Sequence, residues 1–238
     1  MTKQIENQRI LIAGGSSGIG LATAQLLSGL GAIVTITGRD EKKLQKVKQE
    51  NPKLNITKLD SSDPADLQVF FSSSGTFHHL IISVSGSKGA GSFPTLSLDE
   101  LRAGFDQKFW SHLETIQAAL PFVEKTGSVT LVTAASSSAR LPGTSGLAAI
   151  NGALEIMVPI LAKDLQPLRI NAVSPGVIDT AWWDFLNEAD KADTFAHFSK
   201  QVCVGRVGQA EEVANAILSV VINNYVNGIV LSCHGGLG

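Results

Sequence analysis

The chain has 238 residues, of which 44% are hydrophobic and 17% charged, which fits one folded α/β domain and excludes intrinsic disorder. The formal net charge is −2 without a basic block, which excludes an extended nucleic-acid surface. The only cysteines are Cys203 and Cys233, so a disulfide scaffold is excluded and a reducing compartment is favoured.

The segment Met1–Gln8 is polar and too short for a signal peptide. No apolar run is expected to span a membrane. We therefore expect a cytoplasmic protein without a membrane or nucleic-acid partner, and we predict no metal site.

Strand-like and helical patterns alternate along the chain. Expected strands cover residues 9–13, 33–37, 54–59, 80–84, 128–133, 169–173 and 228–232. Expected helices cover residues 21–30, 40–50, 63–71, 97–123, 147–165 and 210–221, with a mobile loop at 85–91, a polar loop at 136–146 and an irregular, partly helical excursion at 180–201. Repeated βα units with apolar strands predict a Rossmann-like, doubly wound parallel sheet with helices on both faces, and no linker divides the single domain 1–238.

The first strand runs directly into a glycine-rich turn and a helix. The spacing is Gly14-x-x-x-Gly18-x-Gly20. Glycines allow the backbone to approach a phosphate, and a helix N-terminus offers free N–H groups and a partial positive charge. The order strand–turn–helix therefore predicts a dinucleotide site, with a plain β–α connection as the alternative.

The second strand ends in Thr37-Gly38-Arg39, without the acidic residue that commonly binds the ribose of NAD at this point. Asp40 comes one residue later. The Arg39 guanidinium suits a 2′-phosphate, with Ser16 and Thr37 as nearby hydroxyls. NADP(H) is therefore the expected cofactor, although Arg39 can also be an ordinary solvated side chain.

The other strand ends supply further candidate contacts. Asp60 and Ser61 can meet the adenine edge, although Asp60 can instead cap the next turn. The stretch 83–86 can lie along the adenosine ribose, and the rigid turn at 174–180 can satisfy a nicotinamide carboxamide through its backbone N–H groups.

Several motifs together resemble the short-chain dehydrogenase/reductase family, compact type, over nearly the whole length. These are the glycine turn with Ile19, Asp60, the run Arg169-Ile170-Asn171-Ala172-Val173-Ser174-Pro175-Gly176 with Thr180, Val226-Asn227-Gly228, and Gly235-Gly236. The resemblance implies a Rossmann-like domain, a nicotinamide cofactor, a small-molecule substrate and a homodimer or homotetramer.

The resemblance also implies a catalytic Asn-Ser-Tyr-Lys tetrad, and this chain departs from it. Lys108 falls at the Asn position, Ala134 at the Ser position, Leu147 at the Tyr position and Asn151 at the Lys position. The only tyrosine, Tyr225, precedes the last strand and is expected in packing or an interface. General acid–base catalysis contributes about 10²- to 10⁴-fold, so an ordinary ketone would react slowly here.

Partial replacements for the tetrad are present. Lys108 can offer a cation to a developing oxyanion, and Asn151 can bind the ribose. Residues 136–138 offer serine hydroxyls, and His112 lies one turn after Lys108; solvated or packed side chains are the alternative in each case. Trp182 and Trp183 can form a lid over the nicotinamide or belong to the core.

These considerations predict an NADP(H)-dependent oxidoreductase that reduces quinones or activated carbonyls. The alternative is a catalytically inactive NADP(H)-binding sensor that acts through a protein partner. The predicted catalytic residue is Lys108, and the predicted cofactor contacts are Gly14, Ser16, Ser17, Gly18, Ile19, Gly20, Thr37, Gly38, Arg39, Asp60, Ser61, Ser83, Ser85, Gly86, Asn151, Pro175, Gly176, Val177, Ile178 and Thr180.

Overall fold

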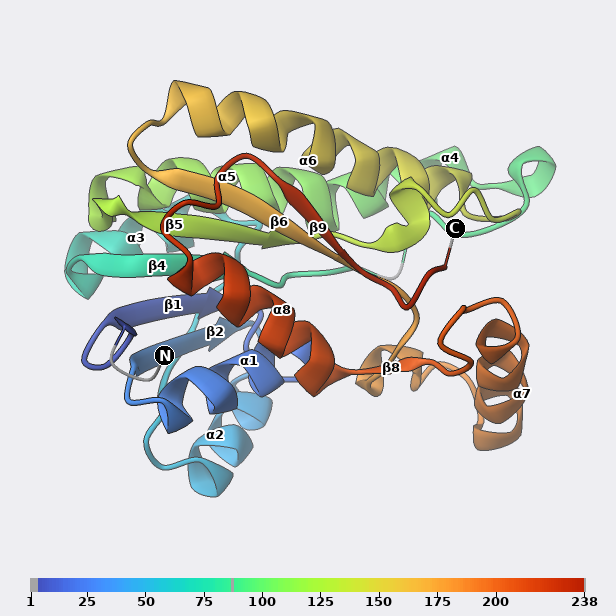
Figure 1. Cartoon of the computed structure of the whole chain (residues 1–238), viewed down its shortest axis with the longest axis horizontal. Coiled ribbons are helices and arrows are strands. Elements are labelled where there is room, and N and C mark those ends of the chain that lie inside the picture. The colour runs from blue at the N-terminus through green and yellow to red at the C-terminus, as the bar shows by residue number, and fades with distance from the viewer. Residues whose placement is uncertain (1–3, 87, 238) are drawn as a thin grey trace.

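A parallel sheet of seven strands forms the centre of the computed structural model, in the order β3-β2-β1-β4-β5-β6-β9 (Figure 1). The structure describes residues 4–86 and 88–237; residues 1–3 and 238 of the expected domain, and position 87 of the expected mobile loop, lie outside them. The chain moves outward from β1 to β3 and then returns to β4 on the other side of β1. In such sheets the reversal between β1 and β4 is where a ligand crevice opens.

The strands are β1 Arg9–Ala13, β2 Ile33–Gly38, β3 Asn55–Lys58, β4 Phe77–Ile82, β5 Val123–Val132, β6 Arg169–Pro175 and β9 Val230–Cys233, with a separate parallel pair of β7 Ile178–Asp179 and β8 Gly208–Gln209. The helices are α1 Gly18–Gly29, α2 Glu41–Glu50, α3 Pro64–Ser74, α4 Leu98–Gly104, α5 Ser111–Ala119, α6 Ser145–Asp164, α7 Glu188–Ser199 and α8 Ala210–Ile222. A π-helical segment, Phe105–Trp110, joins α4 to α5.

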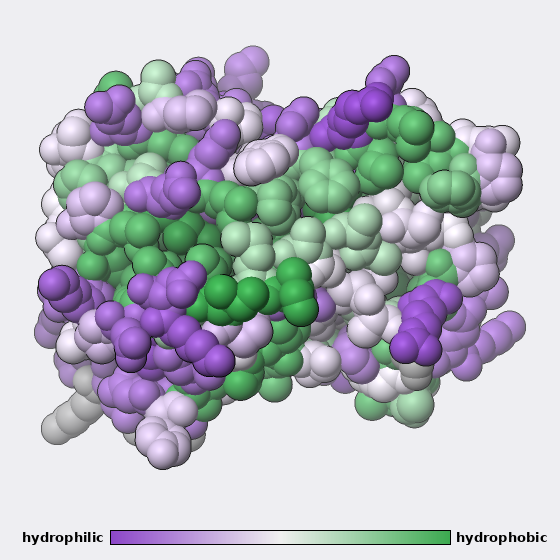
Figure 2. Space-filling model, turned by 90° about the horizontal axis from the view of Figure 1, so that it is seen from above, coloured by the Kyte–Doolittle hydropathy of each residue, from purple (hydrophilic) through white to green (hydrophobic). Residues whose placement is uncertain are grey.

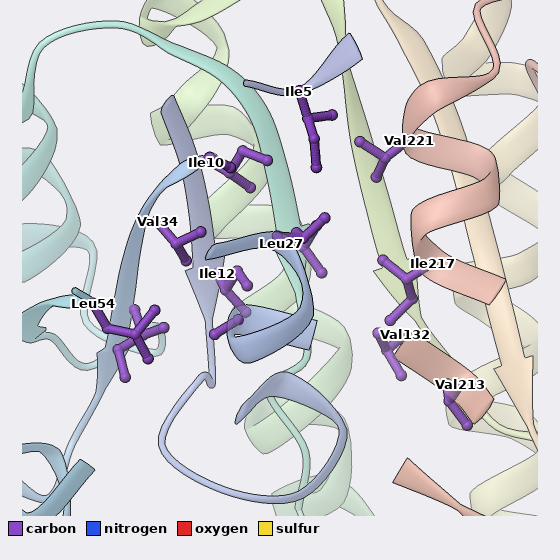
Figure 3. Close-up of a cluster of buried hydrophobic side chains, with 14 of the residues drawn as sticks. Ile5, Ile10, Ile12, Leu27, Val34, Leu54, Val132, Val213, Ile217 and Val221 are labelled. Atoms are coloured by element: carbon purple, nitrogen blue, oxygen red, sulfur yellow. The ribbon is translucent and has the colours of Figure 1, made fainter. Parts of the chain in front are cut away.

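Two apolar layers hold the helices to the two faces of the sheet. Along β1, Ile10 and Ile12 belong to one buried cluster, which includes side chains of α1, α2 and α8 (Figure 3). Leu11 and Ala13 belong to the other cluster, with α3, α5 and α6. Because side chains alternate along a strand, each strand serves both layers. The prediction of a doubly wound parallel sheet is thereby confirmed.

The expected helix over 97–123 is interrupted. It consists of α4, the π-helical segment and α5, and it ends at Ala119, followed by a 3-10 turn that contains Pro121. Proline has no N–H to continue a helix, so the chain enters β5 already at Val123. The first helix begins at Gly18, earlier than the predicted residue 21, so the glycine turn itself supplies its first residues.

Helix α6 corrects the expectation that no segment is long and apolar enough to span a membrane. Among the described residues, only this helix reaches that length and hydropathy, and the core helix of a folded domain meets the same criterion. In this fold Leu154 and Val158 of α6 are fully buried against the sheet, whereas Ile156 and Ile160 are exposed.

A buried histidine lies near the amino end of the sheet. His79 on β4 is 6% exposed. Its Nε2 donates to Gln8 Oε1, and Ser128 Oγ donates to its Nδ1, both at 2.8 Å. Burial and the nearby Arg169 lower the pKa of His79 to about 3. The folded protein therefore holds this side chain neutral.

Acid should destabilise the fold through His79. Its folded pKa lies below its ordinary value of 6.5, so the unfolded chain binds the extra proton, and stability falls as the pH drops from about 6.5 towards 3. In urea titrations, moving from about pH 7.5 to about pH 5.5 should cost about 1 kcal/mol of unfolding free energy through this residue. In His79→Gln, the loss of unfolding free energy between these two pH values should be smaller by that amount. An equal loss in both proteins would contradict the lowered pKa of His79.

Candidate functional site

A cavity of about 640 Å³ opens beyond the carboxyl ends of the central strands. The predicted Lys108 lines it, together with every predicted cofactor contact except Gly20 and Thr37. The lining predicted residues are Lys108, Gly14, Ser16, Ser17, Gly18, Ile19, Gly38, Arg39, Asp60, Ser61, Ser83, Ser85, Gly86, Asn151, Pro175, Gly176, Val177, Ile178 and Thr180.

The glycine turn brings three backbone segments together. Gly14 has a φ of 82°, and a Cβ on it would lie 2.7 Å from the Ser83 carbonyl carbon. The N–H groups of Gly14 and Gly15 both donate to Thr37 O at 3.0 Å. Ser17, the N-cap of α1, makes no capping hydrogen bond with its side chain, and the first turn, within the described chain, contains no acidic residue. Free N–H groups therefore face the cavity without a competing carboxylate, an arrangement that fits a phosphate.

Two predicted contacts have other roles. A Cβ on Gly20 would collide with Gly14 O, so Gly20 allows the turn to close and does not line the cavity. The Thr37 side chain is fully buried, and its hydroxyl has no partner among the described residues. Thr37 acts through its backbone carbonyl, which corrects the expectation that its hydroxyl faces a phosphate.

Positive charge gathers where β2 ends. Arg39 and Lys43 both line the cavity. Asp40 accepts the Lys43 N–H at 3.1 Å as the N-cap of α2, and neither Asp40 nor the following Glu41 lines the cavity. Asp60 accepts from the N–H and hydroxyl of Ser62 at 3.0 and 2.6 Å, which favours the capping alternative for it. Lys43 was missed because the charged pattern of its helix indicated only an exposed face.

The loop after β6 lies beside the glycine turn. The nearest atom to a Cβ on Gly18 would be Thr180 Cβ, at 3.3 Å. Thr180 Oγ1 accepts the Trp182 N–H at 3.4 Å, and the Trp182 indole donates to Gly86 O at 3.3 Å. Trp182 thus connects segments 96 residues apart in sequence across the cavity.

Aromatic side chains form the wall of the cavity beyond Thr180. Trp182 and Trp183 both line it, with ring centroids 4.8 Å apart in an edge-to-face arrangement. The Trp183 ring also contacts the rings of Phe195 and Phe198 of α7. Helix α7 has no buried residue, and the Trp183 indole also donates to Ile178 O at 3.0 Å. The lid over the nicotinamide stays a prediction.

Lys108 lies on the inner wall of the cavity, within the π-helical segment. The residue is 8% exposed, and its Nζ donates to Thr133 O at 3.2 Å. Burial lowers the pKa of Lys108 to about 8, and the charge of Glu155 opposes this shift. The amine is therefore mainly an ammonium at neutral pH, close to the point at which it can release a proton.

Two of the residues predicted at tetrad positions have apolar side chains. Ala134 and Leu147 both line the cavity, and neither side chain can exchange a proton. Tyr225 is fully exposed and does not line the cavity. Asn151 donates to Ser136 Oγ at 3.1 Å and to Leu147 O at 2.9 Å, and its buried Oδ1 has no partner in the described part of the chain.

Three of the other candidates, Ser137, Ser138 and His112, are excluded by their positions. Ser136 lines the cavity, whereas Ser137 and Ser138 do not and instead donate to nearby backbone carbonyls. His112 is fully buried and outside the cavity lining, and its Nδ1 donates to Lys108 O at 2.8 Å. Burial and Lys108 lower the pKa of His112 to about 3. Its role is therefore to support the backbone of Lys108.

Glu155 is the acidic residue that sequence reasoning missed. Its Oε1 accepts Thr133 Oγ1 at 2.6 Å and Ser174 Oγ at 2.9 Å. A carboxylate four residues after Asn151, in a helix of mostly small and apolar residues, was the available signal, because that spacing places both on one helix face.

The arrangement combines a crevice at the strand ends with the nearly buried amine of Lys108 on its inner wall. At one end, the α1 N-terminus, Arg39 and Lys43 suit phosphate groups. At the other end, Lys108 faces an apolar and aromatic wall. Within the described residues no cluster of metal-ligating side chains occurs.

Comparisons with known proteins agree with this geometry. Residues 13–238 match the family model described as enoyl-(acyl carrier protein) reductase. The short-chain dehydrogenase/reductase ATR9 of Stachybotrys chlorohalonatus is 30% identical, over 98% of this chain and 97% of that protein.

Two similar solved structures hold NADPH. One is a small-chain dehydrogenase in complex with NADPH, 28% identical with a TM-score of 0.85, covering 98% of this chain and 99% of that one. The other is an NADPH-bound short chain oxidoreductase from Pseudomonas aeruginosa PAO1, described as containing an atypical catalytic center; it is 26% identical with a TM-score of 0.88, covering 97% of this chain and 96% of that one. The chain belongs to the short-chain dehydrogenase/reductase family of oxidoreductases.

Proposed function

We propose that this protein is an NADP(H)-dependent reductase of quinones or other activated carbonyl compounds, with Lys108 in place of the tyrosine acid of its family. The observation that carries the proposal is a nearly buried ammonium on the inner wall of a dinucleotide-shaped cavity. The NADPH complexes of the two similar structures support the choice of cofactor.

The cofactor end of the cavity favours NADP(H) over NAD(H). The free N–H groups of α1 suit the pyrophosphate, and Arg39 with Lys43 suits a 2′-phosphate. A ribose 2′-hydroxyl would need an acidic partner after β2, and neither Asp40 nor Glu41 lines the cavity. The unpartnered Oδ1 of Asn151 offers an acceptor to a ribose hydroxyl.

Lys108 supplies the chemistry on the protein side. NADPH, when bound, supplies a hydride to the electrophilic carbon of the acceptor. The electron pair of the acceptor C=O bond then moves to its oxygen, and the Lys108 ammonium stabilises that anion and donates a proton to it. Because a quinone delocalises the negative charge it gains, it demands less acid catalysis than a simple ketone.

The acceptor end of the cavity favours a flat, apolar molecule. Leu147, Ile150, Trp182 and Trp183 all line the cavity. Aromatic faces favour planar rings through stacking and edge contacts.

The exposed face of α6 supports assembly with a second copy of the chain. Ile156 is 68% exposed and Ile160 55% exposed. Figure 2 looks down on the helix layer above the sheet and shows hydrophobic side chains spread over this face. Apolar patches of this kind mark association sites, and a two-fold dimer would bury the same patch of both copies. We therefore propose a homodimer or homotetramer built through α6.

The proposed contact between Arg39 and the 2′-phosphate of NADPH can be tested directly. Arg39→Asp should weaken NADPH binding by about tenfold or more and leave NADH binding nearly unchanged, because only NADPH carries the phosphate. Calorimetry with both cofactors measures this. Lys46→Asp makes the same charge reversal at an exposed position of α2 and serves as the control. Equal losses for NADPH and NADH in Arg39→Asp would exclude this role.

The role of Lys108 has a second test. With NADPH and a panel of quinones and carbonyls, the wild-type kcat for reduction should fall as the pH rises through about 8, where the ammonium loses its proton. Lys108→Met should lower kcat by about 10²-fold and remove this dependence, with NADPH affinity nearly unchanged. NADPH binding without turnover of any acceptor by the wild-type protein would contradict the proposal and favour the alternative of an inactive sensor.

Assembly through α6 is measured by sedimentation. The wild-type protein should sediment as a dimer or tetramer, and Ile156→Asp should shift it towards the monomer, because a buried, unpaired carboxylate opposes association. Val69→Asp, at a 70% exposed position on α3, is the matched control. A monomeric wild-type protein at micromolar concentration would rule out the assembly.

A further inference from the structure

A chain of polar contacts lies behind the inner wall of the cavity, where β5 and β6 end. The Lys108 ammonium donates to Thr133 O at 3.2 Å. The hydroxyl of the same threonine donates to Glu155 Oε1 at 2.6 Å. Thr133 therefore connects the amine of the π-helical segment with the carboxylate of α6.

Glu155 also fixes the neighbouring strand. Ser174 on β6 donates its hydroxyl to the same Oε1 at 2.9 Å, and the Thr133 N–H donates to Val173 O at 2.9 Å. Both hydroxyls therefore converge on one oxygen of the Glu155 carboxylate. A negative charge is thus held directly behind the residue that contacts Lys108.

The surroundings of Lys108 otherwise oppose its positive charge. Burial lowers its pKa, and Glu155 is the charged group that acts in the opposite direction. His112, on the next turn of the same helical segment, is neutral. Leu147 and Ala134, which also line the cavity, carry no charge. Without Glu155, the described residues would leave the amine in a buried site without a counter-charge.

We propose that Glu155 is a positioning residue that keeps Lys108 in its ammonium form and, through Thr133 and Ser174, fixes the strand ends that border the acceptor. Glu155 does not line the cavity, so it acts through Thr133 and through its charge and does not touch the substrate. This inference rests on the proposed function of Lys108, and the experiment below separates the two.

The test follows the titration of Lys108 itself. In protein with ¹³C-labelled lysine, the Lys108 Cε resonance is assigned by its absence from Lys108→Met and followed against pH without any substrate. Glu155→Gln keeps the size and one acceptor oxygen but removes the charge, and its Lys108 midpoint should fall by about one pH unit. Glu155→Asp, which keeps the charge, should titrate closer to the wild-type protein.

Glu114→Gln is the matched control, because Glu114 lies on α5 outside the cavity lining; its Lys108 midpoint should equal that of the wild-type protein. An unchanged midpoint in Glu155→Gln would overturn the proposal whether or not the enzyme turns over. If the Lys108 midpoint falls in Glu155→Gln, the pH at which the reduction rate declines should fall by the same amount. A lower Lys108 midpoint with an unchanged pH dependence of the reduction rate would support the role of Glu155 and exclude the catalytic role of Lys108.

Discussion

The close backbone contact between Gly14 and the Ser83–Val84 segment is the constraint on which the site depends. No side chain fits there, since a Cβ on Gly14 would lie 2.7 Å from the Ser83 carbonyl carbon and oxygen. This approach lets β1 and β4 end side by side at the reversal of the sheet, while Gly20 lets α1 start directly beneath the turn. The free N–H groups of α1 then face the crevice, and the later strand ends complete its walls.

The alternation of apolar strands and amphipathic helices was enough to predict the sheet, because buried parallel strands carry a distinctive pattern. Many residues that line the cavity were predictable for the same reason, since they follow strand ends. What the pattern could not show was the direction of individual side chains. Thr37 is the clearest case: its place at a strand end suggested a phosphate contact, but side chains alternate along a strand and this one points into the protein.

The catalytic region was harder to predict because its contacts join distant segments. The sequence placed Lys108 and Glu155 on separate helices, 47 positions apart, and only Thr133 between them makes a connection. The π-helical segment, which sets where Lys108 and His112 point, has no clear signature in the sequence. The spacing that made His112 a candidate acid was correct, yet its burial makes it a neutral support. The cavity thus has on its inner wall a nearly buried Lys108 whose charge depends on its neighbours.

The central claim is that NADP(H) lies in this cavity with its nicotinamide and the acceptor next to Lys108. A crystal structure of the protein with NADP⁺ and a bound quinone or hydroquinone tests it most directly. Our account predicts the 2′-phosphate against Arg39, the pyrophosphate at the N-terminus of α1, and an acceptor oxygen within about 3 Å of Lys108 Nζ. A structure with the cofactor in place but the acceptor oxygen bound away from Lys108, or with the 2′-phosphate free in solvent, would contradict it.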